Sequence, residues 1–395
     1  MVPLFDYNGR IIVFMSLKRT PLYAVHLRLG GRMVDFGGWE MPVQYSGILD
    51  EHRAVRTAAG LFDISHMGQA SIGGPRAKVF LNNLLTNDIN KLTVGHGQYT
   101  LMCNPQGGAI DDLIVYCVAP DRYWLIINAS RAETDLAWIH TQLALFSGRD
   151  GVHLENYCGK FGAVALQGPR SRDLIDTCLT PNTATLSPTG PASRLVKNQI
   201  GSYLFKGGSV WAASTGYTGE DGFEIFAPSE KIESLWNDLM AAGAAVGIKP
   251  AGLGARDTLR TEAGYPLYGH ELDEHTSPLE ACLGRFVALG KSEFIGREVL
   301  VQQKEQGISK QLVGFKMTGK SAPPRPHYPI WTLGPEAAQI GRVVSGTQSP
   351  SLGIGIGMAY VPPSHAAPGT PLAVEIRGQM TPAVVVKRPI YKSPV

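Results

Sequence analysis

Residues 99–117 have the sequence YTLMCNPQGGAIDDLIVYC, and this stretch decides how the fold is interpreted. Two runs of strand-forming residues flank the segment NPQGG at 104–108, whose residue types favour turns. A strand, a short turn and a second strand predict a β-hairpin. The second strand begins with two adjacent acids, Asp111 and Asp112, and continues as an apolar run in which an unpaired carboxylate is costly to bury.

The alternation of side chains along a strand separates the two acids. Successive side chains point to opposite faces of a sheet, so Asp112 shares one face with Ile114 and Tyr116, whereas Asp111 lies on the other. We expect Asp112 to face a ligand or, alternatively, to be a turn aspartate bonded to nearby backbone. Asp111 is expected to serve the end of the hairpin or a local hydrogen bond.

Composition excludes several classes of protein. The chain has 395 residues, enough for two or three domains, and its hydrophobic content of 44% allows an ample core. A net charge of +3 is too small to indicate nucleic-acid or membrane binding. The five cysteines are scattered without metal-ligand spacing, which predicts free thiols in a reducing compartment and no metal site. The chain also lacks the run of about 20 apolar residues that a membrane span requires.

Segment composition predicts three parts. Residues 1–14 are interpreted as an N-terminal extension that precedes a biological start at Met15, since they lack the long apolar core of a signal peptide. Within 15–290, helical and strand-like segments alternate without a glycine-rich phosphate loop, which favours an antiparallel α+β fold. Residues 62–72 among them alternate in a strand-like way. In 291–395, short strands separated by Pro- and Gly-rich loops predict a small β-barrel or sandwich.

A second candidate site element is the segment 215–226, TGYTGEDGFEIF. Its three glycines permit close approach of backbone to a ligand. In the strand that follows them, Glu224 projects from the face opposite Phe223 and Ile225. This carboxylate is either a ligand-binding group or a solvent-facing edge residue.

A third element is the segment 252–263, GLGARDTLRTEA, which predicts a helix. Arg256 and Arg260 lie at positions i and i+4, where like charges cost about 0.2–0.5 kcal/mol. Asp257 can pair with Arg260, which leaves Arg256 in need of a carboxylate from the protein or from a ligand. Together with the tyrosines, these groups predict a pocket for a planar, nitrogen-rich, hydrogen-bonding ligand, with no metal and no evident nucleophile.

Several segments of the chain resemble the aminomethyltransferase (T-protein) family of the glycine cleavage system. They are RTPLY at 19–23, MVDFGGWEMP at 33–42, LFDISHM at 61–67, and the stretches 108–116, 216–224, 251–260 and 345–353. The resemblance extends in order from about Arg19 to Tyr391.

The resemblance implies a fold and a reaction. The fold is α+β and three-lobed, like a cloverleaf: two interleaved antiparallel α+β lobes and a C-terminal β-barrel, with the folate-binding region at 15–290 and the barrel domain at 291–395. Tetrahydrofolate would occupy a central channel as co-substrate. The implied partner is the lipoylated H-protein, whose aminomethyl group would yield 5,10-methylenetetrahydrofolate and ammonia. The compartment would be the cytoplasm of a bacterium or the mitochondrial matrix of a eukaryote.

The resemblance also implies roles for individual residues. Asp112 matches the catalytic carboxylate, and Glu224 and Arg256 match a pair that binds the pterin ring. Positions that line the folate pocket are matched by Tyr99, Tyr116, Met67, Asn128, Tyr217 and Tyr265. Simple hairpin pairing places Thr100 opposite Asp112, so Tyr99 reaches Asp112 only through a bulge or register shift, or else contacts the ligand from the far end of its strand.

Two alternatives stay open within the same superfamily. One is a non-catalytic folate-binding protein, against which the retained Asp112 argues. The other is a folate-binding protein of iron–sulfur maturation, whose cysteine-containing motif is absent from residues 216–222.

Overall fold

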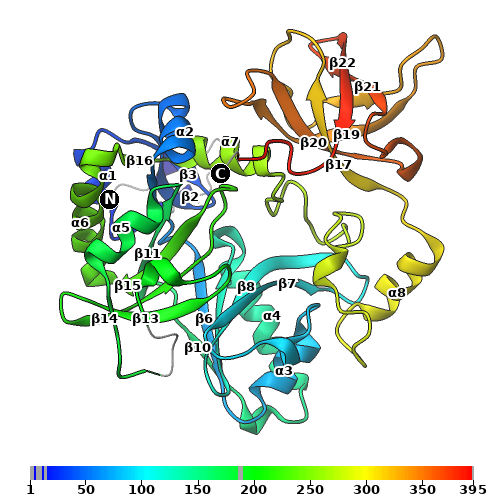
Figure 1. Cartoon of the computed structure of the whole chain (residues 1–395). Helices are drawn as coiled ribbons and strands as arrows, with labels where there is room; N and C mark the ends of the chain where they lie inside the picture. Colours follow the sequence, from blue (N-terminus) through cyan, green and yellow to red (C-terminus); the bar gives the residue numbers. More distant parts are fainter. Residues whose placement is uncertain (1–3, 6–10, 13–15, 186–189, 394–395) are drawn as a thin grey trace.

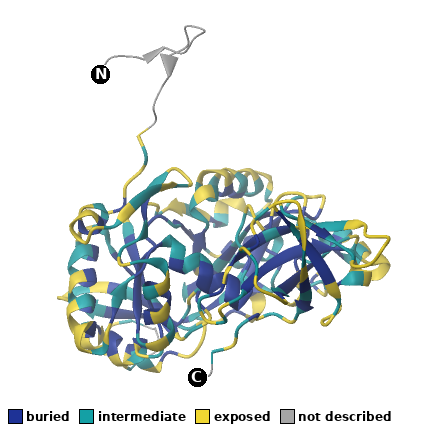
Figure 2. Ribbon diagram, turned by 90° about the horizontal axis from the view of Figure 1, so that it is seen from above, coloured by how far each residue is buried: buried dark blue, intermediate teal, exposed yellow. Residues whose placement is uncertain are grey.

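A computed structural model describes residues 4–5, 11–12, 16–185 and 190–393. The described chain forms three lobes, of which two are mixed α+β and one is a β-barrel (Figure 1). Buried residues run through the strands of all three lobes, and exposed residues lie mainly on helices and loops of the surface (Figure 2). The predicted α+β class with a C-terminal barrel is confirmed.

The first lobe is built on a five-stranded antiparallel sheet. Its strand order is β10 (His153–Asn156), β6 (Gly68–Gly73), β9 (Arg122–Ile127), β8 (Ala109–Ala119) and β7 (His96–Cys103). Helices α3 (Ala77–Leu84) and α4 (Ala132–Leu145) cover one face. Leu113 and Val115 point into that core, whereas Ile114 and Tyr116 point to the opposite face. The alternation predicted for the second strand of the hairpin is therefore confirmed.

The second lobe contains a seven-stranded sheet. Its order is β12 (Thr180–Pro181), β13 (Ile200–Phe205), β14 (Gly208–Ala213), β15 (Gly222–Pro228), β11 (Phe161–Gln167), β5 (Gly60–Asp63) and β16 (Lys249–Pro250), antiparallel except for the pair β16–β5. Helices α1 (Tyr23–Arg28), α5 (Ser171–Cys178) and α6 (Ile232–Gly243) pack on its outer face around Trp236. Its inner face shares a core with the first sheet, in which the rings of Trp124 and Phe226 lie 4.9 Å apart.

The two α+β lobes are interleaved along the chain. Strand β5 belongs to the second sheet, the chain then builds β6 to β10 of the first sheet, and it returns to the second sheet at β11. The strand-like stretch 62–72 divides between two strands, because β5 ends at Asp63 and β6 begins at Gly68 in the other sheet. Residues 64–67 make the crossing, so a single alternating pattern serves two different sheets.

The third lobe is a closed barrel. Its strands follow the order β17 (Gln311–Met317), β20 (Gly355–Val361), β19 (Gln339–Gln348), β18 (Pro329–Trp331), β21 (Pro371–Ile376) and β22 (Gln379–Val386). Helix α8 (Arg297–Gln306) leads into it. Two further helices, α2 (Ile48–Thr57) and α7 (Leu253–Ala263), pack together, and β3 (Arg32–Phe36) and β4 (Trp39–Gln44) form a separate hairpin.

The N-terminal segment is described only in part. Strands β1 (Leu4–Phe5) and β2 (Ile11–Ile12) pair antiparallel. The rest of 1–14, and Met15, lie outside the described residues, so the extension stays a prediction, as do the boundaries at 15–290 and 291–395.

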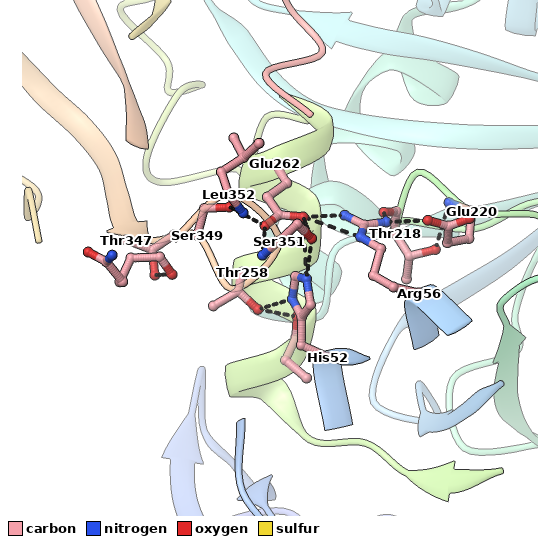
Figure 3. A network of polar contacts seen from close by, with 12 residues as sticks. His52, Arg56, Thr218, Glu220, Thr258, Glu262, Thr347, Ser349, Ser351 and Leu352 are labelled. Carbon is pink, nitrogen blue, oxygen red and sulfur yellow. Dashed lines mark hydrogen bonds and ion pairs between the residues drawn. The ribbon is translucent and has the colours of Figure 1, made fainter. Parts of the chain in front are cut away.

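A buried carboxylate on α7 joins the barrel to the α+β lobes (Figure 3). Glu262 accepts hydrogen bonds from the Ser351 amide at 3.0 Å and from its hydroxyl at 2.8 Å, both on the loop after β19. From α2, the Arg56 guanidinium lies 2.7 Å and the His52 imidazole 3.3 Å from the same carboxylate. Burial raises the pKa of Glu262, but the hydrogen bonds from His52, Ser349 and Arg56 outweigh it and bring the value down to about 2.

Replacing Glu262 by Gln should destabilise the folded chain by about 3 kcal/mol at pH 7, because it leaves the buried Arg56 charge without this partner. The pKa of Glu262 is lower in the folded than in the unfolded chain. Its contribution is therefore complete above about pH 4.3 and is lost as the pH falls toward 2, where the wild type and the variant should converge. Urea unfolding at several pH values measures the difference.

The matched control is Glu305→Gln on α8, where the glutamate is exposed. This variant should unfold like the wild type. Equal stability of the Glu262→Gln and Glu305→Gln variants at pH 7 would contradict the role of Glu262.

Candidate functional site

The hairpin that carries Asp112 contains a β-bulge beside Ile110. Because of the bulge, Leu101 rather than Thr100 lies opposite Asp112, so simple pairing was wrong by one residue. Tyr99 then lies on the same face of the sheet as Asp112, at the diagonal position. Its hydroxyl donates a hydrogen bond to Asp112 Oδ2 over 2.8 Å.

Asn128, directly after β9, connects the two adjacent acids. Its side-chain nitrogen donates to Asp112 Oδ1 at 3.1 Å and to Asp111 Oδ1 at 2.9 Å, and its backbone N–H donates to Asp111 Oδ2 at 3.1 Å. Asp111 is fully buried and makes the local hydrogen bonds expected of it. One amide therefore fixes the position of both carboxylates.

The environment of Asp112 brings its ionisation close to neutral pH. Burial raises the pKa of Asp112 to about 7, and the neighbouring charge of Asp111 acts in the same direction. Hydrogen bonds from Tyr99 and Asn128 oppose the rise because they stabilise the ionised form. Asp112 therefore changes charge near pH 7, a property typical of functional sites.

Glu224 and Arg256 approach the site from the second lobe. Glu224 on β15 accepts a hydrogen bond from Thr215 Oγ1 at 2.8 Å, and burial raises the pKa of its carboxyl. The Arg256 guanidinium on α7 lies 4.5 Å from the centre of the Tyr217 ring. Burial lowers the pKa of Arg256.

The two arginines of α7 differ in how the protein satisfies them. Arg260 forms ion pairs with Asp257 at 2.7 Å and with Glu271 at 3.0 Å, so the predicted pairing with Asp257 is confirmed. Among residues 4–5, 11–12, 16–185 and 190–393, no side chain or backbone group forms a hydrogen bond or ion pair with the Arg256 guanidinium. Arg256 is therefore available to a ligand.

These groups line a cavity of about 1450 Å³ where the three lobes meet. Of the residues implied by the resemblance, the cavity brings together Met67, Tyr99, Asp112, Asn128, Tyr217, Glu224, Arg256 and Tyr265. The rings of Tyr217 and Tyr265 lie 5.7 Å apart, tilted by 30°. Barrel residues 311–314 and the C-terminal residues 386–389 and 391–393 also line the cavity.

Tyr116 has a different place from the other implied residues. It is fully buried and is not among the residues that line the cavity. Its hydroxyl lies 3.2 Å from Thr215 Oγ1, which in turn donates to Glu224. Tyr116 is thus connected to Glu224 through Thr215, behind the surface of the cavity.

Sequence reasoning missed two sets of residues. Thr215 connects Tyr116 to Glu224, and its only signal was its position at the start of the glycine-rich segment. Several cations also line the cavity, namely Arg56, Lys197, Arg285, Lys387, Arg388 and Lys392. They come from distant segments of the chain, so no local motif marks them.

The described part of the chain contains no group of three or more His, Cys, Asp or Glu residues arranged to hold a metal ion. None of its helices has both the length and the apolar character needed to cross a membrane.

Replacing Tyr99 by Phe should raise the pKa of Asp112 by roughly one unit, because the variant loses a hydrogen bond that stabilises the ionised carboxylate. The pKa can be followed by carbon-13 NMR of labelled aspartate carboxyls. The control Tyr328→Phe removes a hydroxyl from the barrel and should leave the titration unchanged. An unshifted Asp112 titration in Tyr99→Phe would show that the hydrogen bond does not set its charge.

Comparison with known proteins identifies the family. The family model of the GCVT N-terminal domain matches residues 22–291. The family model of the glycine cleavage T-protein C-terminal barrel domain matches residues 310–392. The aminomethyltransferase of Symbiobacterium thermophilum is 47% identical over 96% of this chain and 98% of its own length. That of Chlorobaculum tepidum is 46% identical over 94% of this chain and 98% of its own.

A solved structure agrees with these relatives. The glycine cleavage system aminomethyltransferase T of Bartonella henselae superposes with a TM-score of 0.85 at 32% identity, covering 96% of this chain and 99% of that one. The chain therefore belongs to the glycine cleavage T-protein family of aminomethyltransferases, which are transferase enzymes.

Proposed function

We propose that this chain transfers the methylene carbon of the aminomethyl group on lipoylated H-protein to tetrahydrofolate. The observation that carries the proposal is the cavity between the lobes, where Asp112, held by Tyr99 and Asn128, lines the same space as Glu224 and Arg256. No described residue forms a hydrogen bond or ion pair with the Arg256 guanidinium. Membership of the T-protein family supports the same reaction.

The cavity has the chemistry that tetrahydrofolate requires. The pterin ring of tetrahydrofolate is planar and carries hydrogen-bond donors and acceptors. The carboxylate of Glu224 and the guanidinium of Arg256 complement these groups. Tyr217 and Tyr265 add aromatic faces on which a flat ring can pack. A half-buried Arg256 that forms no hydrogen bond or ion pair with the described residues fits a site that is completed by its ligand.

The reaction balances without a redox step. The C–N bond to the amino group and the C–S bond to the lipoyl sulfur break, and two new C–N bonds form to the folate. The folate nitrogens give up two hydrogens, of which one reaches the lipoyl sulfur and the other leaves with ammonia as ammonium. When bound, tetrahydrofolate supplies the two nitrogens that receive the carbon.

Asp112 has two tasks in this scheme. Positive charge develops on the carbon as ammonia leaves, and a fixed carboxylate in a buried site stabilises it. Because Tyr99 and Asn128 hold both carboxylate oxygens, Asp112 does not have to reorganise during the reaction. Its pKa of about 7 also suits a group that exchanges a proton near neutral pH.

Replacing Asp112 by Asn should abolish most turnover while preserving the fold and tetrahydrofolate binding, because the amide keeps the shape but lacks the charge. A loss of about 100-fold or more in kcat is expected for a charge that acts in the transition state. The assay measures methylenetetrahydrofolate formed from aminomethylated H-protein and tetrahydrofolate.

The control is Asp150→Asn, a change at an exposed aspartate, which should turn over like the wild type. Near-normal turnover in Asp112→Asn would exclude its assigned role. If the wild type bound tetrahydrofolate but formed no product with aminomethylated H-protein, the chain would be a non-catalytic folate-binding protein instead.

Replacing Arg256 by Gln should weaken tetrahydrofolate binding by about 10- to 100-fold, the loss expected for a charged hydrogen-bonding group. Isothermal titration calorimetry measures the affinity. The control Arg122→Gln removes an exposed guanidinium from β9 and should bind like the wild type. Unchanged affinity in Arg256→Gln would place the folate ring elsewhere.

A further inference from the structure

Asp135 on α4 is a buried acid that the proposed mechanism does not use. The residue is fully buried, and neither of its carboxylate oxygens receives a hydrogen bond from any donor in the described part of the chain. An ionised carboxylate in such a place would carry a large desolvation penalty. This position is therefore suited to a neutral, protonated carboxyl.

Asp111 is the group that can accept a hydrogen bond from a protonated Asp135. The carboxyl groups of Asp135 and Asp111 lie within hydrogen-bonding range of each other. Carboxylates have no hydrogen to donate, so the two groups can bond only if one of them is protonated. Asp111 already accepts two N–H groups from Asn128, at 2.9 and 3.1 Å, which favours its ionised form and leaves the proton on Asp135.

We propose that Asp135 is a positioning residue whose protonated carboxyl donates a hydrogen bond to Asp111. This bond keeps Asp111 ionised and able to accept both N–H groups of Asn128, whose side chain also holds Asp112. The inference rests on the proposed function, because Asp112 is the group that it positions.

The titration behaviour of the three acids agrees with this arrangement. Burial raises the pKa of Asp135 to about 11, and the charge of Asp111 adds to the rise, so Asp135 keeps its proton at neutral pH. Burial also raises the pKa of Asp111, but the hydrogen bonds from Asp135 and Asn128 oppose that rise. The ionised Asp111 in turn contributes to the raised pKa of Asp112.

The other charged groups around the pair are already engaged. The titratable groups that face Asp135 are Asp111 and Asp112 on β8, Arg131 directly before α4, and Tyr268 in the segment after α7, with Glu274 beside Arg131. Arg131 pairs with Glu274 at 2.7 Å and donates to the Ile110 carbonyl at 3.2 Å. Tyr268 donates to the Ala109 carbonyl at 3.0 Å. None of these groups supplies Asp135 with a hydrogen bond.

Two substitutions in the full chain test whether Asp135 acts as a hydrogen-bond donor or only fills space. Asp135→Asn keeps a neutral hydrogen-bond donor, so its kcat and pH profile should match those of the wild type. Asp135→Leu removes the donor, so Asp111 takes up a proton more readily and its charge no longer raises the pKa of Asp112. The acid limb of the kcat profile should then move to lower pH by roughly one unit. At the optimum kcat should fall by about tenfold, with little change in the KM for tetrahydrofolate.

Infrared spectroscopy gives a readout that does not depend on turnover. At a pH well above 7, where Asp112 is ionised, the wild type should show the C=O stretch of a buried protonated carboxylic acid, and this band should lose intensity in Asp135→Asn. The exposed-site control Asp150→Asn should retain it. The band also tests the proposal if Asp135→Leu fails to fold.

Three results would overturn the inference. These are an infrared spectrum of Asp135→Asn identical to that of the wild type, a pH profile of Asp135→Asn displaced as far as that of Asp135→Leu, and a folded Asp135→Leu variant with the wild-type profile. A wild type that shows the infrared band but no turnover would instead refute the proposed function and leave the protonated Asp135 intact.

Discussion

The site depends on how a sheet can hold carboxylates away from water. Two adjacent acids in a buried strand would repel each other and lose hydration, so each requires donors from the protein. Asn128 supplies them to both acids, and Tyr99 supplies one more to Asp112. Burial and the charge of Asp111 raise the pKa of Asp112, and the hydrogen bonds from Tyr99 and Asn128 oppose that rise only in part.

The β-bulge is what allows this arrangement. Without the extra residue at Ile110, Thr100 would lie opposite Asp112, and Tyr99 would point to the other face of the sheet. A shift of one residue therefore decides whether the tyrosine hydroxyl reaches the carboxylate. Bulges at such positions are structural features that aim a side chain, and this one aims Tyr99 at Asp112.

Local periodicity predicted the hairpin over 99–117, the helix over 252–263 and the opposite orientations of Asp111 and Asp112. It did not predict the features that depend on distant residues. The alternation placed Asp112 and Asp111 on opposite faces, because a strand has a fixed period of two. It could not reveal the bulge, nor that residues 62–72 cross from one sheet to another, because both depend on which strands pair. Asp135 escaped notice for a similar reason: an acid within an amphipathic helix usually faces solvent, and only the packing of α4 on the sheet shows that this one is buried.

Helix α7 both contacts the barrel and lines the cavity. Arg256 faces the cavity, Arg260 donates to Ser345 on barrel strand β19 at 2.8 Å, and Glu262 binds Ser351 on the loop after that strand. The spacing of four residues between the two arginines places them on one side of the helix, yet within the described part of the chain only Arg260 has ion-pair partners. The barrel thus docks on the same helix that presents Arg256, so the contacts between barrel and helix also help to fix the position of Arg256 in the cavity.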